Sequence, residues 1–216
     1  MIYTKKKAFN DIVKSLGDQK RVFIVGCADC ATTCATGGED QVKEMSTLLG
    51  QSGYEVTGGL VLKVPCDKRI TRQFINQNEK VLDKTDVILV LSCGSGINSV
   101  GQIAPTRIKV RAGLDSVFLG ATERIGDFRE FCSHCGECLV NESEAICTTT
   151  RCSKGLINGP CGGAQGDRCE VDNERECIWI TIYNKNPDAP IFKRIMEPKK
   201  NSRSQRPNTI KKAKAT

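Results

Sequence analysis

The chain is poor in several residue types, and each shortage narrows the range of functions. Of its 216 residues only one is a histidine, His134, and aromatic residues make up 5%. The single histidine excludes His-rich metal sites and leaves thiolate as the main metal ligand available. No apolar run approaches the roughly 18 residues of a membrane helix, and the N-terminal stretch "MIYTKKKAFNDIVKSLG" lacks the apolar core of a secretory signal. We therefore expect a cytoplasmic protein without membrane insertion.

Acidic residues are missing from the end of the chain. From residue 198 onward there are seven basic residues and no acidic one, whereas the rest of the chain has 25 of each sign. The formal net charge of +7 thus comes from the tail, and the body does not have the charge of a nucleic-acid binder. Residues 187–216 are predicted to form a disordered basic tail. A solubilising role, docking onto an acidic partner and weak nucleic-acid contact are alternatives for it.

The first half of the chain alternates strand-like and helix-like segments. Strands are predicted at 21–27, 54–66, 86–94 and, more weakly, 115–121. Helices are predicted at 38–53 and 68–85 and before Gly17, with a helix or a wrapping loop within 95–103. Alternation of this kind indicates a parallel sheet with crossover helices. Residues 1–127 are therefore predicted to be a small α/β domain of flavodoxin-like or Rossmann-like type.

The alternating pattern stops after Phe128. Glycine and cysteine dominate residues 128–186, and the apolar segment at 176–186 is short enough to be a helix or a strand. A region with so few apolar residues needs a bound ligand to replace the missing core. We therefore predict an irregular cysteine-rich metal-cluster domain over 128–186.

Thirteen cysteines are present, and in a reducing compartment they favour metal ligation over disulfides. Cys27, Cys66 and Cys93 each follow a predicted strand, and Cys30 and Cys34 lie in the loop after the first strand. The carboxyl ends of parallel strands meet at one edge, where open α/β folds place their ligands. The sequence predicts a site of Cys27, Cys66 and Cys93, completed by Cys30 or Cys34 or both, for zinc or an iron–sulfur cluster. The glycine turn in "CATGGED" is expected to direct backbone N–H groups toward this site.

The other eight cysteines lie in one region with the spacing C-x2-C-x2-C-x8-C-x4-C-x8-C-x7-C-x7-C. They are Cys132, Cys135, Cys138, Cys147, Cys152, Cys161, Cys169 and Cys177. A zinc ribbon needs two C-x2-C knuckles, whereas C-x2-C-x2-C opens a bacterial [4Fe–4S] motif, here without its usual Cys-Pro continuation. Eight thiolates match two four-cysteine clusters. His134 is interpreted as a neighbour of the thiols rather than a ligand, since thiolates are in supply.

Two stretches, "GCADCATTCATGGE" and "CSHCGECL…ICTTTRCSKGLINGPCGG…CEV…C", resemble the cysteine-rich C-terminal family associated with methylenetetrahydrofolate reductase. The chain looks in particular like the small iron–sulfur subunit that accompanies the flavin-bearing reductase subunit in acetogenic anaerobes. The resemblance covers residues 21 to 183. Thr148 stands where the family typically has proline, and the basic tail is not part of the resemblance.

The resemblance implies an electron-transfer role in acetogenesis through the Wood–Ljungdahl pathway, where methylenetetrahydrofolate is reduced to methyltetrahydrofolate. The flavin and folate sites would belong to the partner subunit, and a further subunit for electron input is an additional candidate partner. Two [4Fe–4S] clusters are expected in the second region, with a third as an option at the first site and zinc as an alternative at one site. A zinc-stabilised scaffold without a redox role is the main alternative function. A zinc-dependent nucleic-acid binder is disfavoured by the neutral body.

Overall fold

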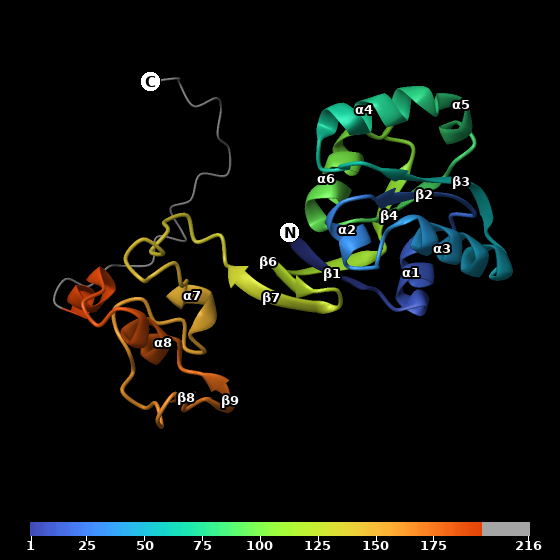
Figure 1. Ribbon diagram of the computed structural model, residues 1–216. Helices are drawn as coiled ribbons and strands as arrows, with labels where there is room; N and C mark the ends of the chain where they lie inside the picture. The colour runs from blue at the N-terminus through green and yellow to red at the C-terminus, as the bar shows by residue number, and fades with distance from the viewer. Residues whose placement is uncertain (196–216) are drawn as a thin grey trace, which may run out of the picture. The chain divides into compact units, whose positions relative to one another are not determined.

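A computed structural model describes residues 1–195 of the chain, which divides into two compact units, Met1–Phe128 and Arg129–Thr216. Residues 196–216 are outside the described part, so the predicted basic tail from 198 onward is too. Among residues 1–195, no helix is long and apolar enough to cross a membrane. The elements of the first unit are shown in Figure 1.

A four-stranded sheet with the strand order β3-β2-β4-β5 forms the centre of the first unit. Its strands are β2 (Arg21–Cys27), β3 (Glu55–Leu62), β4 (Val87–Leu91) and β5 (Lys109–Ala112). All three pairings are parallel, with Cys27 beside Leu62 and Gly26 beside Leu91. Every residue of β4 is buried, as its continuous apolar run predicts for a strand covered on both faces. The predicted parallel α/β fold is confirmed.

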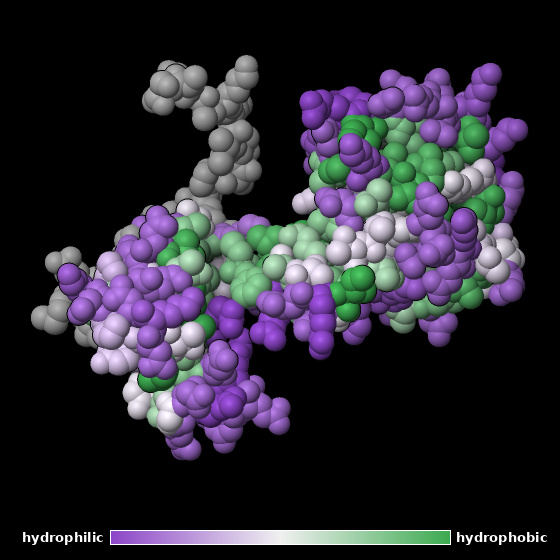
Figure 2. All heavy atoms as spheres, viewed as in Figure 1, coloured by the Kyte–Doolittle hydropathy of each residue, from purple (hydrophilic) through white to green (hydrophobic). Residues whose placement is uncertain are grey.

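Helices cover both faces of this sheet (Figure 1). On one face lie α1 (Phe9–Leu16) and α3 (Glu39–Gln51), whose buried side chains form one apolar cluster with Ile24 and Leu89. On the other face lie α4 (Lys68–Gln77), α5 (Glu79–Leu82) and α6 (Gly94–Ile103), which form a second cluster with Val25 and Val90. Figure 2 shows hydrophilic residues over the outer side of α4 and α5 with apolar residues beneath them.

One predicted helix is divided. The segment 68–85 forms α4 and α5, which meet at Asn78, where the side-chain amide and the backbone N–H both donate to the carbonyl of Phe74. The start of α4 is fixed by Asp67, whose carboxylate accepts the backbone N–H of Arg69 at 2.9 Å. Within 95–103 the helical alternative is the one observed, as α6.

The strand predicted at 115–121 does not join the parallel sheet. It belongs to β6 (Leu114–Arg124), the middle strand of a separate sheet with the order β1-β6-β7, in which β1 (Ile2–Lys6) pairs with it in the antiparallel direction. The prediction of only a helix before Gly17 was therefore wrong for Ile2–Lys6, where a β-branched and aromatic stretch forms a strand. The third strand is β7 (Asp127–Cys132). The fourth parallel strand is β5 instead.

The second unit contains short elements around a small apolar core. They are α7 (Thr148–Arg151), β8 (Arg168–Cys169), β9 (Asp172–Glu176), α8 (Ile178–Lys185) and the 3₁₀ helix η1 (Pro190–Ile195). The ambiguous segment at 176–186 is thus mainly helical. Trp179 and Ile182 of α8 are buried together with Ala189 and Ile191, so packed chain extends beyond residue 187, where the sequence placed the start of the tail. The expectation of a missing apolar core was wrong around α8.

Glycine at position 37 allows the loop before α3 to pack against the ends of β2 and β4. The carbonyl of Gly37 accepts the backbone N–H of Cys27 at 2.8 Å. A Cβ at position 37 would lie 2.1 Å from the carbonyl oxygen of Leu91. A larger residue therefore cannot occupy this position without moving the loop that links Cys27, Cys30 and Cys34.

We expect Gly37→Ala to lower the free energy of unfolding by about 1–3 kcal/mol, as overpacking of a close contact does. Gly50→Ala is the matched control, because Gly50 lies in α3 with no atom within 4 Å of an added Cβ. The control should be neutral or stabilising by up to about 1 kcal/mol. Urea unfolding followed by circular dichroism measures both, and equal effects of the two substitutions would contradict the packing argument.

Candidate metal centres

The parallel sheet brings three predicted ligands to one edge. Cys27 is the last residue of β2, Cys66 follows β3 in the turn before α4, and Cys93 directly precedes α6 after β4. Chain order along the sheet reverses between β2 and β4, so Cys27 and Cys93 flank the switch point where open α/β sheets form their ligand crevice. Cys30 begins the four-residue helix α2 (Cys30–Thr33) just after β2.

Three thiols of this edge have raised pKa values. Burial raises the pKa of Cys27, and negative charge on Cys30 and Cys93 raises it further. Burial is also the main cause of the raised pKa of Cys66, to which Cys93 and Cys30 add. The pKa of Cys30 is raised by burial, with Asp29 and Cys93 contributing. The strand topology therefore places Cys27, Cys30, Cys66 and Cys93 near the same edge of the sheet.

Cys34 is directed elsewhere. Its thiol donates to the backbone carbonyl of Ile2 in β1 at 3.8 Å. The Cys30 thiol accepts the backbone N–H of Ile2 at 3.4 Å, so β1 contacts both cysteines. The glycine turn also differs from expectation, because the N–H of Gly37 donates to the carbonyl of Ala31 and that of Gly38 to the side chain of Gln41. These N–H groups already have partners and are not directed at the thiols.

Four cysteines of the second region line one cavity of about 20 Å³. They are Cys152, Cys161, Cys169 and Cys177. The cavity wall also contains Ser153, Lys154, Glu170 and Trp179. A free volume of this size is close to that of one small ion or water, so a cubane cluster would require the cavity walls to move apart. The donor chemistry, four soft sulfurs, suits zinc and iron–sulfur clusters alike.

Positive charge lies beside two of these thiols. Lys154 forms an ion pair with Glu170. The pKa of Lys154 is raised first by its hydrogen bond with Glu170, and the nearby Cys161 and Cys169 raise it further. The pKa of Cys169 is lowered, first by its hydrogen bond with Ser153 and then by backbone N–H groups and Arg175. A thiol with a lowered pKa is a thiolate over more of the pH range and is better prepared to bind a metal.

Two buried polar atoms in this unit have no hydrogen-bond partner among the described residues, Nε1 of Trp179 and Oγ1 of Thr148. Trp179 is the only tryptophan in the chain, is 2% exposed and lines the four-cysteine cavity. Buried indole N–H groups usually have an acceptor. A metal-bound sulfur in the cavity would supply such an acceptor.

The remaining four cysteines of the region lie between β7 and α7. Cys132 ends β7, and its sulfur accepts the backbone N–H of His134 at 3.4 Å. The Cys135 thiol donates to the carbonyl of Glu137 at 3.4 Å. Cys138 is exposed, and Cys147 directly precedes α7. Turns with positive φ at His134 and Gly136 curve the chain between the first three of these cysteines.

Within residues 1–195, neither unit holds its side chains in a finished coordination geometry. Among residues 1–195, no three or more His, Cys, Asp or Glu side chains are arranged so that they could hold a metal ion. The thiols at the sheet edge and around the cavity are gathered but would have to turn toward a common centre. Ser153, Lys154, Glu170 and Trp179 were not predicted from the sequence to lie at this site. Of these four, only Trp179 could have been suspected, because it is the single tryptophan of the chain and lies two residues after Cys177.

Residues 111–204 match the family model described as "Methylene-tetrahydrofolate reductase C terminal". The matched segment contains all eight cysteines of the second region and none of those at the sheet edge. No curated protein matches the chain. The match confirms the resemblance to this family for residues 111–183, the second half of the range 21–183 for which it was stated.

In metal-free, reduced protein, Cys169 should be alkylated by iodoacetamide before Cys27 at neutral pH. The thiolate is the reactive form, and the pKa is lowered at Cys169 and raised at buried Cys27. Ser153→Ala removes a hydrogen bond that lowers the pKa of Cys169, so its alkylation should move to higher pH. Ser46→Ala, whose hydroxyl donates to the Val42 carbonyl in α3, is the control. Peptide mass spectrometry across a pH series measures both rates, and an unchanged Cys169 profile in Ser153→Ala would contradict the assignment.

Proposed function

Because residues 111–204 match the methylene-tetrahydrofolate reductase C-terminal family model, we propose that the chain is an electron-transfer subunit of a methylenetetrahydrofolate reductase complex. Bound [4Fe–4S] clusters would supply single-electron chemistry. The hydride that reduces the folate carbon would come from a flavin on a partner subunit.

The observation that supports the proposal best is the gathering of thiols at two separate places. We assign Cys152, Cys161, Cys169 and Cys177, which line one cavity, to one centre. The other four cysteines of the family-matched segment, Cys132, Cys135, Cys138 and Cys147, are assigned to a second centre by their spacing. Cys27, Cys30, Cys66 and Cys93 are assigned to a third at the sheet edge, because they follow three parallel strands whose carboxyl ends meet there. Cys34 is left out of the third set.

The surroundings of the cavity suit a group that gains and loses electrons. Arg175 brings positive charge near Cys169, which favours the more negative, reduced form of a bound cluster, whereas the charge of Lys154 is balanced by Glu170, whose carboxylate forms a hydrogen bond with Cys161. Trp179 would add a hydrogen-bond donor, and the buried side chains of α8 limit access of water. These residues therefore tune a centre rather than carry out catalysis on a substrate.

A zinc-binding scaffold of the same complex is the second candidate. The observation that favours it is the small free volume of the four-cysteine cavity, about 20 Å³, which suits a single ion better than a cubane. Zinc at this one place is compatible with electron transfer through the other centres. Zinc at all three centres would not be compatible with electron transfer, because zinc has no redox chemistry.

The chain purified without oxygen should be brown and contain about four irons and four sulfides for each cluster. Cys93→Ser should remove about four irons if the sheet-edge set holds a cluster. Cys34→Ser is the matched control and should leave the iron content unchanged, because its thiol is directed to Ile2. Elemental analysis with sulfide determination measures these contents. Colourless protein with stoichiometric zinc and no iron would contradict the electron-transfer proposal.

Replacing Trp179 by phenylalanine should make the reduction potential of the cavity centre more negative. The substitution keeps an aromatic ring but removes the N–H donor that stabilises the reduced form. The loss of one hydrogen bond is worth about 1 kcal/mol, on the order of 40 mV for a one-electron couple. Tyr183→Phe is the control, since Tyr183 is 53% exposed on the same helix. Redox titration followed by electron paramagnetic resonance measures the shift, and equal potentials in the two variants would refute the role of the indole.

A further inference from the structure

A pocket of about 430 Å³ in the second unit collects four arginines and three glutamates. The arginines are Arg129 of β7, Arg151 of α7, Arg168 of β8 and Arg175 of β9. Its volume lies within the roughly 300–1,000 Å³ range of small-molecule sites. No cysteine lines it, although Arg151 also contributes to the wall of the four-cysteine cavity. Glu176 also lines both, and Arg175 lies near Cys169, so the pocket adjoins the four-cysteine cavity but has a charged lining of its own without a thiol.

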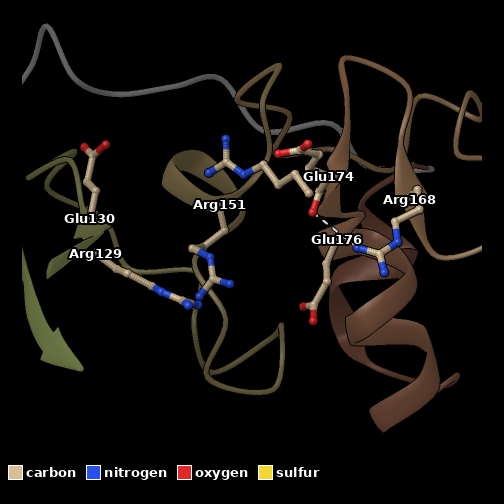
Figure 3. A pocket seen from close by; sticks show the side chains of 7 residues that line it. Arg129, Glu130, Arg151, Arg168, Glu174 and Glu176 are labelled. Atoms are coloured by element: carbon tan, nitrogen blue, oxygen red, sulfur yellow. Dashed lines mark hydrogen bonds between the residues drawn. The ribbon is translucent and has the colours of Figure 1, made fainter. Parts of the chain in front are cut away.

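Within the described part of the chain, the positive charge at one end of this pocket has no counter-ion. Among residues 1–195, neither Arg129 nor Arg151 forms an ion pair, and Arg151 instead packs its guanidinium over the ring of Phe131 at 5.3 Å. Figure 3 shows the side chains of Arg129 and Arg151 extending toward one another, while Glu130 extends away from them. Two guanidinium groups directed at the same space repel each other unless an anion lies between them.

The other two arginines are held by weak or neutral partners. Arg168 pairs with Asp167 at 3.4 Å and donates to the backbone carbonyl of Glu174 at 3.2 Å. Arg175 donates to the hydroxyl of Ser153 at 3.3 Å. Their planar guanidinium groups have further N–H donors, and such groups bind phosphate and carboxylate with two parallel hydrogen bonds.

The glutamates determine what else the ligand must carry. Glu130, Glu174 and Glu176 line the pocket, and within the described part of the chain none of them pairs with its arginines. Four positive and three negative side chains leave a formal charge of +1, so the anionic groups of a ligand must lie beside the arginines and its neutral polar groups beside the glutamates. Carboxylates accept hydrogen bonds from hydroxyl groups. No aromatic side chain lines the pocket, so recognition by ring stacking is not available to the ligand.

We propose that this pocket binds a small metabolite that carries two or more phosphate or carboxylate groups together with hydroxyl groups. Its anionic groups lie between Arg129 and Arg151 and reach toward Arg168 and Arg175. Its hydroxyl groups donate to the glutamates. The proposal does not depend on which metal the cysteines bind.

Isothermal titration calorimetry of the full, metal-loaded chain at low salt tests the proposal, with ADP, citrate and sulfate as separate probes. ADP carries phosphates with hydroxyl groups, citrate carries carboxylates with one hydroxyl group, and sulfate is a bare anion. We expect ADP or citrate to bind at least about tenfold more tightly than sulfate. Arg129→Gln should weaken that binding about tenfold or more, the effect of losing a charged hydrogen bond. Arg72→Gln, at an exposed position of α4, should not change it.

Binding of ADP alone identifies phosphate as the recognised group, and binding of citrate alone identifies carboxylate. Either result supports the proposal if Arg129→Gln removes it. Because Arg129 is exposed and unpaired within residues 1–195, this variant should keep the wild-type circular dichroism spectrum, which is checked alongside. The proposal is overturned if neither ADP nor citrate binds, if sulfate binds as tightly as they do, or if Arg129→Gln and Arg72→Gln behave alike.

Discussion

Parallel pairing of β2 with both β3 and β4 is the constraint on which the first candidate centre depends. The register places Cys27 beside Leu62 and Gly26 beside Leu91, so the carboxyl ends of three strands coincide. Cysteines that are 27 to 66 residues apart along the chain therefore reach one edge without any local motif. The close approach of Gly37 to Leu91 then holds the loop with Cys30 against the same edge. Fold and site share one origin, the burial of the sheet between two helical layers.

The two units prepare their thiols in opposite ways. At the sheet edge, desolvation and neighbouring negative charge raise the pKa values of Cys27, Cys30 and Cys66, so a metal that bound there would have to displace their protons. Around the cavity of the second unit, Ser153 and nearby positive charge lower the pKa of Cys169. The pKa of Cys27 is raised because the thiol is desolvated at the end of a buried strand. The pKa of Cys169 is lowered because its thiol lies near Ser153, at the turn that joins the polar, exposed strands β8 and β9.

Strand periodicity predicted β2 and β4 well because both are continuous apolar runs, and β2 has the predicted bounds, whereas β5 was missed because Lys109–Ala112 has no such run. The same reasoning failed at 115–121, because the choice between two sheets depends on β1, a strand formed from the N-terminal residues 2–6 that had been assigned to a helix. It could not decide between Cys30 and Cys34, which differ only in the direction of their thiols relative to Ile2. The positions of Lys154, Glu170 and Trp179 beside the thiols could not be predicted from the sequence, because they depend on tertiary packing.

The central claim is that the chain carries electrons and does not itself transform the folate. Turnover of methylenetetrahydrofolate with a reduced viologen dye tests it most directly, measured for the chain alone, for the flavin subunit alone, and for both together. The account predicts no turnover by the chain alone and dye-dependent turnover by the pair that is lost when the chain's metal is removed. Turnover by the chain alone, or a pair that works equally well with metal-free chain, would contradict it.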